Sequence, residues 1–126
     1  MERVLTAEPE ARWAYLFGSA ARGQGDWRDL DVGVVTSRGF GLLDLGRLAS
    51  ALEEATRERV DVVDLGAAPP IFVHDILRGR TRLLLDRERG ARLDWESEQI
   101  SRALDFLPTY QETLAAWRSR VREVTP

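Results

Sequence analysis

The sequence contains no cysteine and no lysine, and these two absences exclude several kinds of chemistry. Without cysteine there can be no disulfide framework, no thiolate metal site and no cysteine nucleophile. Without lysine there can be no Schiff-base lysine, no lysine general base and no phosphate-binding lysine of the Walker-A type. All 18 basic residues are therefore arginine, and the lack of cysteine agrees with a reducing compartment such as the cytoplasm.

The sequence also lacks an excess of positive charge and a long apolar run. The 18 arginines are outnumbered by 21 acidic residues, which gives a formal net charge of −3, so direct binding to nucleic acid is not expected. No apolar run approaches the roughly 20 residues of a membrane-spanning helix, and the acidic N-terminus does not resemble a signal peptide. With 126 residues, 44% of them apolar, we expect a single globular α/β or α+β domain in the cytoplasm.

Hydrophobic patterning predicts strands and helices over the first two thirds of the chain. Apolar or alternating runs typical of strands occupy residues 13–17, 29–35 and 59–65. Leucines at helical spacing predict an amphipathic helix over 42–57. We expect a short helix or turn within 1–12, and a loop over 20–28 that can begin with one helical turn. A short helix is expected at 71–79, and a strand or extended arm at 81–86.

The last third of the chain is expected to be helical. Apolar residues recur every seven positions from Leu93 to Val121, and a second set, which includes Trp117, falls three residues after them. Such a stripe is typical of a helix face that packs against another helix. Pro108 lies inside the stripe, and because proline removes a backbone hydrogen bond we expect two helices or a kink there.

Two interpretations of this stripe are open. The first 90 residues look able to close their own core, which favours a contact between the stripe and another chain, either a second copy or a partner. We expect that contact around Tyr110, Leu114 and Trp117. Alternatively, the stripe packs on the sheet of its own chain.

One arrangement of residues points to chemistry. Gly18 and Ser19 end the first strand, where a glycine lets the backbone approach a phosphate and a hydroxyl can bond its oxygens. Asp29 and Asp31 project from one face of the second strand, where paired carboxylates can share divalent cations such as Mg²⁺. Asp61, on the third strand, lies on the same face if the register allows, as a further ligand or a proton acceptor.

The three segments LFGSAARG, DLDVGVV and VDVVDL together resemble the minimal nucleotidyltransferases of the DNA polymerase beta superfamily. Further along, PIFVHDILRGRTRLLLDRE and ALDFLPTYQETL are similar to MNT-type antitoxins of HEPN/MNT toxin–antitoxin pairs. The likeness covers roughly residues 13–120. It implies an α+β nucleotidyltransferase fold, in which helices flank a small mixed sheet. The core would span about 10–86, and a C-terminal helical segment about 90–124.

The resemblance also implies an activity, which is the transfer of AMP from ATP to a tyrosine of a HEPN ribonuclease toxin. Asp29 and Asp31 would hold two Mg²⁺ ions, and Asp61 would complete the metal site and help to deprotonate the tyrosine. Three residues would bind the triphosphate: Gly18, Ser19 and, as a phosphate contact, Arg22.

The sequence departs from this family in the loop before the acidic pair. Nine residues separate Ser19 from Asp29, where the family usually has ten. Arg28 stands where the family usually has a serine, and Trp27 beside it is also unusual. These departures leave open an antitoxin that neutralises its toxin by binding alone, and a nucleotidyltransferase for a small molecule is a further alternative. A homo-oligomer is also left open. We expect His74 to be a structural or surface residue, and Asp64 to face away from the metals.

Overall fold

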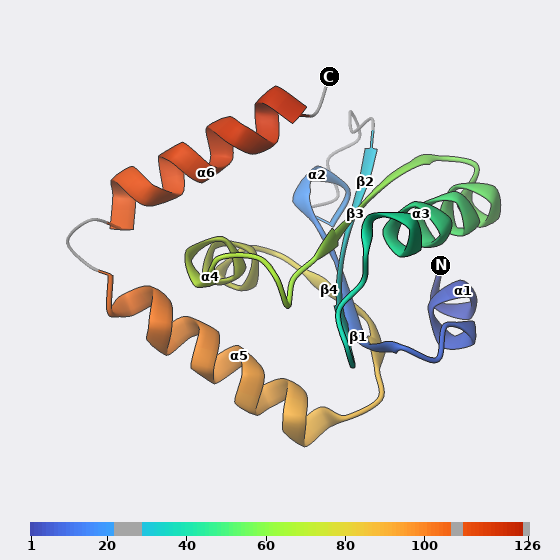
Figure 1. The fold of residues 1–126 in the computed structure, drawn as a ribbon, viewed down its shortest axis with the longest axis horizontal. Coiled ribbons are helices and arrows are strands. Elements are labelled where there is room, and N and C mark those ends of the chain that lie inside the picture. The colour runs from blue at the N-terminus through green and yellow to red at the C-terminus, as the bar shows by residue number, and fades with distance from the viewer. Residues whose placement is uncertain (22–28, 107–109, 125–126) are drawn as a thin grey trace.

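The computed structural model describes the backbone of residues 1–21, 29–106 and 110–124 (Figure 1). The elements in chain order are α1 (Glu2–Ala7), β1 (Ala11–Phe17), α2 (Gly18–Ala21), β2 (Asp29–Thr36), α3 (Leu42–Thr56), β3 (Arg59–Asp64), α4 (Pro70–Arg78), β4 (Arg82–Asp86), α5 (Arg89–Leu104) and α6 (Tyr110–Val124). No helix within these ranges is long and apolar enough to cross a membrane.

The strands form one mixed sheet with the order β3-β2-β1-β4. β1 pairs antiparallel with β2 and with β4, whereas β2 and β3 are parallel and are connected through α3. The end of β1 therefore meets the starts of β2 and β3 at one end of the sheet. The mixed sheet and its flanking helices confirm the expected α+β class.

Helices α1 and α3 cover one face of the sheet (Figure 1). Their apolar sides meet the even-numbered side chains of the central strands, where Val32, Val34 and Leu52 have no exposed surface. Leu5 of α1 is buried in the same cluster. This core is built from aliphatic side chains that need no hydrogen bond, so its stability comes from burial and close packing.

Helices α4, α5 and α6 lie on the opposite face, where aromatic side chains dominate (Figure 1). Trp13 of β1 is buried, and its ring centroid lies 5.8 Å from that of Trp95 on α5. The ring of Trp117, on α6, lies 5.2 Å from that of Phe72, on α4. Residues from both C-terminal helices therefore complete the second core.

This packing corrects our expectation that the first 90 residues close their own core. Trp117 packs on its own chain, but its ring lies against Phe72 of α4, whereas the alternative interpretation placed the stripe on the sheet. The side chains of Leu93 and Val121 are 44% and 40% exposed, so the seven-residue repeat does not form one continuous buried face. The side chains of Tyr110 and Leu114 lie outside the described residues, and their contact with another chain stays a prediction.

The element boundaries follow the hydrophobic pattern closely. The strand predicted at 13–17 begins two residues earlier, at Ala11, and the segment at 81–86 forms the edge strand β4. Gly18–Ala21 form α2, which agrees with one helical turn at the start of the predicted loop, and residues 22–28 lie outside the described residues. Two helices, α5 and α6, confirm the expected division of the last third, although Pro108 lies outside the described residues.

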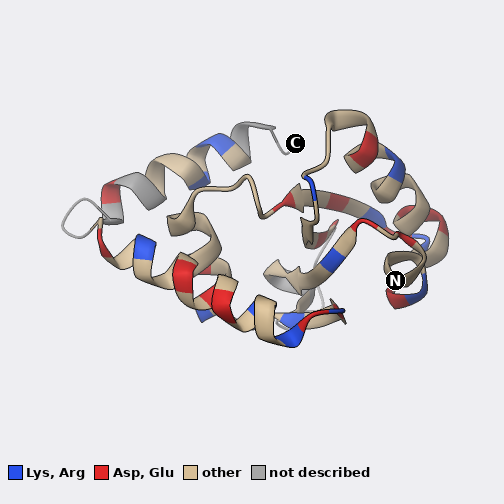
Figure 2. Cartoon of the chain, turned by 60° about the horizontal axis from the view of Figure 1, so that its bottom comes forward, with Lys and Arg blue, Asp and Glu red and all other residues tan. Residues whose placement is uncertain are grey.

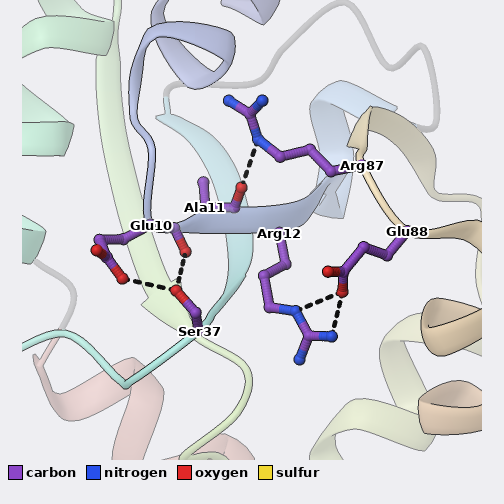
Figure 3. A network of polar contacts seen from close by, with 6 residues as sticks. All are labelled: Glu10, Ala11, Arg12, Ser37, Arg87 and Glu88. Carbon is purple, nitrogen blue, oxygen red and sulfur yellow. Dashed lines mark hydrogen bonds and ion pairs between the residues drawn. The ribbon is translucent and has the colours of Figure 1, made fainter.

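Polar contacts fasten the N-terminal end of β1 to segments distant in sequence (Figure 3). The contacts join β1 and the residue before it to the loop after β2 and to the connection between β4 and α5. They are the 2.6 Å hydrogen bond from Ser37 Oγ to Glu10 Oε2, the 2.8 Å bond from Arg87 Nε to the Ala11 carbonyl and the Arg12–Glu88 ion pair.

Charged residues of both signs are spread along α5 (Figure 2), and some of them anchor this helix to the sheet. Arg92 forms ion pairs of 2.9 Å with Asp86 of β4 and with Glu96 one turn further along. Tyr15 of β1 donates a 2.6 Å hydrogen bond from its hydroxyl to Glu96 Oε1. The aromatic face of the sheet is therefore joined to α5 by a polar network as well as by ring contacts.

Candidate active site

Three carboxylates share one face of the sheet at the end where β1 stops and β2 and β3 begin. Asp29 and Asp31 are two residues apart in β2, so their side chains point to the same side. Asp61 of β3 is the direct partner of Asp31 in the parallel ladder. Because residues paired across neighbouring strands point to the same face, the register that the sequence left open places all three acids together.

Gly18 holds the turn after β1 against one of these acids. Its φ of 78° lies in the left-handed region, which glycine adopts without the cost that a Cβ imposes. A Cβ placed on Gly18 would lie 2.4 Å from Oδ2 of Asp31, well inside van der Waals contact. The backbone of the Gly-Ser turn therefore touches the carboxylate directly, which only a glycine permits.

Electrostatics couple the acids to one another. Burial raises the pKa of the Asp61 carboxyl above its ordinary value, and the negative charge of Asp29 raises it further. Glu53 of α3 acts in the same direction, whereas the positive charge of Arg59 opposes it. Arg59 is the ladder partner of Asp29, with its Nε 3.9 Å from Asp29 Oδ1. A cation bound among these acids would relieve their mutual repulsion.

The donor set suits a hard divalent cation that shares its coordination with a substrate. Within the described ranges, no three Asp, Glu, His or Cys side chains form a group that could hold a metal ion without help. Mg²⁺ does not require such a group, because it usually takes one or two carboxylates and completes its shell with waters and substrate phosphates. Asp31 and Asp61, on strands about 4.8 Å apart, fit that role.

The other predicted residues are less fully placed. The backbone of Ser19 lies in α2, but its side chain is outside the described residues, as are Arg22 and Trp27 altogether. Asp64 lies on the opposite side of β3 from Asp61, as expected, and its Oδ1 accepts a 3.1 Å hydrogen bond from the N–H of Gly66. His74 lies on α4, away from the three acids in sequence and on a different element.

Arg59 is the residue at this site that the sequence reasoning missed. The alternation that places Asp61 on the acidic face places Arg59 there too, two residues earlier in the strand. That signal was available, but an arginine at a strand end is usually a solvated surface residue. Only the pairing of β2 with β3 identifies it as the neighbour of Asp29.

Comparisons with known proteins are consistent with this geometry. The family model described as "Polymerase beta, Nucleotidyltransferase" matches residues 1–89, which is more than half of the chain. The match covers Gly18 and all three acids. A comparison with curated protein sequences finds no match.

Solved structures share the fold along nearly the whole chain, at identities too low to show more than the fold. A crystal structure of a toxin–antitoxin with AMP-PNP matches at 23% identity over 98% of this chain and 94% of the other, with a TM-score of 0.68. A crystal structure of the toxin–antitoxin MntA–HepT matches at 21% identity over 98% and 92%, with a TM-score of 0.63. A tri-AMPylated Shewanella oneidensis HEPN toxin in complex with an MNT antitoxin matches at 20% identity over both complete chains, with a TM-score of 0.62.

Proposed function

This chain belongs to the polymerase beta nucleotidyltransferase family, and from that premise we propose that it transfers AMP from ATP to a tyrosine of a HEPN toxin. The transfer would require Mg²⁺ and would silence the toxin, so the protein would act as an antitoxin. Two of the structures that share its fold support this choice of donor and acceptor, because one is a toxin–antitoxin with AMP-PNP and another contains a tri-AMPylated HEPN toxin.

The single observation that carries the proposal is the ladder pairing of Asp31 with Asp61 beside the turn at Gly18. Two carboxylates from neighbouring strands can hold a cation, and a glycine turn that touches one of them lets a phosphate approach closely. Either feature alone is common in proteins. Their contact with each other is what favours phosphate chemistry over a merely solvated acidic edge.

The proposed reaction forms one bond and breaks one. The phenol oxygen of the toxin tyrosine bonds to the α-phosphorus of ATP, the bond from that phosphorus to the oxygen bridging to the β-phosphate breaks, and pyrophosphate leaves. The phenol proton must be taken up nearby. Asp61 is suited to accept it, because burial and the charge of Asp29 raise its pKa and so increase its basicity.

The remaining roles follow from position. Asp29 and Asp31 would hold two Mg²⁺ ions, with Asp61 completing the set. These ions, when bound, would neutralise charge on the phosphates and on the leaving pyrophosphate. Gly18 lets the phosphates approach the turn, and Ser19 and Arg22 are proposed to bond their oxygens.

The test is the intact mass of a candidate HEPN partner after incubation with this chain, ATP and Mg²⁺. We expect a gain of one or more AMP groups. Asp29→Asn with Asp31→Asn should abolish the gain, because the variant loses the charge that would hold the cations. Asp94→Asn with Asp105→Asn is the matched control, since both residues are exposed and far from the acids in sequence.

Two outcomes would overturn the proposal. If the wild-type chain neutralises its partner without adding mass, it acts by binding alone. If the Asp29 and Asp31 variant modifies the partner at the wild-type rate, the acids are not the catalytic site.

A further inference from the structure

A small pocket adjoins the acidic site, and the function proposed above assigns it no role. It has a volume of about 160 Å³ and lies between the end of β1 and the C-terminal half of α4. The residues that line it include Phe17, Gly18, Phe72, Asp75, Ile76 and Arg80. The rings of Phe17 and Phe72 meet edge to face, with their centroids 6.3 Å apart. The pocket therefore has an apolar wall and a polar rim.

Gly18 is common to this pocket and to the acidic site. It lines the pocket, and it lies so close to Asp31 that a Cβ would meet the carboxylate. A molecule bound among the acids can therefore extend past the turn at Gly18 and into the pocket.

The charges on the rim favour an anion. Asp75 is ion-paired with Arg118 of α6, so its negative charge is compensated. Arg80 follows α4, is exposed, and forms no ion pair with another residue in the described part of the chain. Its positive charge is thus available at the rim of the pocket.

We propose that Arg80 binds the β- and γ-phosphates of the nucleotide, which extend past Gly18 into this pocket. The inference rests on the proposed function, because the α-phosphorus must lie at the acids to react with a tyrosine. In an in-line displacement the leaving pyrophosphate lies on the side of the α-phosphorus opposite the tyrosine, and the pocket that shares Gly18 with the acidic site can receive it. The guanidinium of Arg80 can donate two hydrogen bonds to phosphate oxygens and balance charge that the cations leave uncompensated.

The test compares the affinities of two nucleotides for wild-type protein and for Arg80→Gln, measured by calorimetry with Mg²⁺ present. AMP-PNP carries the β- and γ-phosphate positions, whereas AMP lacks both. We expect Arg80→Gln to bind AMP-PNP about tenfold more weakly, as the loss of a charge-assisted contact implies, and to bind AMP as the wild type does. Arg80→Lys, which keeps the charge but loses the fork of donors, should recover part of the loss.

Arg78→Gln is the matched control, because it makes the same change two residues away. Arg78 is exposed at the end of α4 and does not line the pocket. It should leave the affinity for both nucleotides unchanged. Thermal melting checks that all three variants are folded, which is expected because both arginines are exposed.

Three binding results would overturn the assignment. Equal weakening of AMP and AMP-PNP would mean that Arg80 contacts the nucleoside or the α-phosphate. Unchanged AMP-PNP binding would mean that Arg80 does not touch the nucleotide, and so would a wild-type protein that binds no AMP-PNP. If binding depends on Arg80 as expected but no AMP reaches the HEPN partner, the inference stands and the proposed transfer to that toxin fails.

Discussion

The hydrophobic cores on the two faces of the sheet differ in side-chain composition. Under α1 and α3 the core is aliphatic, and its central residues, such as Val32 and Leu52, have no exposed surface. Under α4, α5 and α6 the core is aromatic, contains the hydroxyl of Tyr15, and borders the three acids. The Tyr15 hydroxyl is hydrogen-bonded to Glu96, whereas the buried indole nitrogens of Trp13 and Trp117 have no hydrogen-bond partner within the described residues.

The difference teaches where this fold places its polar groups. The aliphatic side chains of the first core need no hydrogen-bond partners, so their stability comes from burial and close packing. The aromatic face carries polar atoms that need partners, and these cost free energy when left without one. Such a face is less favourable for packing, but it can bring carboxylates, a turn and a pocket together at one end of the sheet.

The largest effect is expected from Gly18→Ala, which places a methyl group against Asp31 on the polar face. Transfer of AMP should fall at least about 100-fold, because a displacement of the reacting groups by about 1 Å is enough for such a loss. The initial rate of mass gain by the partner measures it.

Gly39→Ala is the control for backbone strain. Gly39 has nearly the same φ, 79°, but a Cβ there would meet nothing within 4 Å. It should lose a little stability and keep its activity. Equal losses of activity in both variants would show that strain, and not the contact with Asp31, matters at Gly18.

On the aliphatic face, Leu52→Ala should lower the free energy of unfolding by about 2–5 kcal/mol, as large-to-small changes at fully buried sites do. Denaturant unfolding measures the loss. The folded fraction should transfer AMP at the wild-type rate, since this face does not touch the acids. If Leu52→Ala loses more activity than its unfolded fraction explains, the aliphatic core affects the acidic site, and the two faces do not have separate roles.

A smaller loss, about 1–2 kcal/mol, is expected for Tyr15→Phe, which removes the hydrogen bond to Glu96 but leaves Glu96 paired with Arg92. Burial raises the pKa of Tyr15 well above its ordinary value, and the hydrogen bond to Glu96 and its negative charge raise it further. A raised pKa stabilises the fold fully below the ordinary value, about 10, and the stabilisation is lost as the pH rises beyond it. The difference between wild type and Tyr15→Phe should therefore shrink in alkaline unfolding experiments. A constant difference up to the alkaline limit would exclude this linkage.

The smallest effect concerns Asp61→Asn and its dependence on pH. The pKa of Asp61 is raised in the folded protein, so the wild type is favoured below the ordinary pKa of aspartate and loses that advantage as the pH rises through the raised value. Asn carries no charge at any pH. In the absence of metal, Asp61→Asn should therefore melt a few degrees higher than wild type at neutral pH. It should show no such gain in acid. The opposite trend would mean that Asp61 is stabilised as an anion.

Much of this site could be predicted from alternation along the strands. The two-residue spacing of Asp29 and Asp31 fixes their common face, and Asp61 and Asp64 separate onto opposite faces by the same rule. The pairing of Asp31 with Asp61 could not be predicted, because register depends on how β2 and β3 meet in space. The contact of Gly18 with Asp31 is likewise tertiary.

The C-terminal helices show why a repeat can mislead. The seven-residue spacing suggested one stripe, but α5 and α6 are separate helices with different partners. Trp95 of α5 packs against Trp13 of β1, and Trp117 of α6 packs against Phe72 of α4. Trp95 and Trp117 pack at different places on the aromatic face, while Leu93 and Val121 stay partly exposed, at 44% and 40%. A seven-residue spacing places side chains on one face only within a continuous helix. It does not predict a common face for two helices that are separated by a break.

The most direct test of the account measures Mn²⁺ binding, in place of Mg²⁺, by electron paramagnetic resonance in the presence of AMP-PNP. It compares variants of the acids on the proposed metal-binding face with a variant on the opposite face of β3. Asp31→Asn and Asp61→Asn should each weaken Mn²⁺ binding at least about tenfold, since each removes a charged ligand. Asp64→Asn, on the opposite face, keeps an oxygen to accept the N–H of Gly66 and should bind Mn²⁺ as the wild type does. If Asp61→Asn binds Mn²⁺ as tightly as the wild type, or if Asp64→Asn weakens binding as much, the paired carboxylates of β2 and β3 are not the metal site.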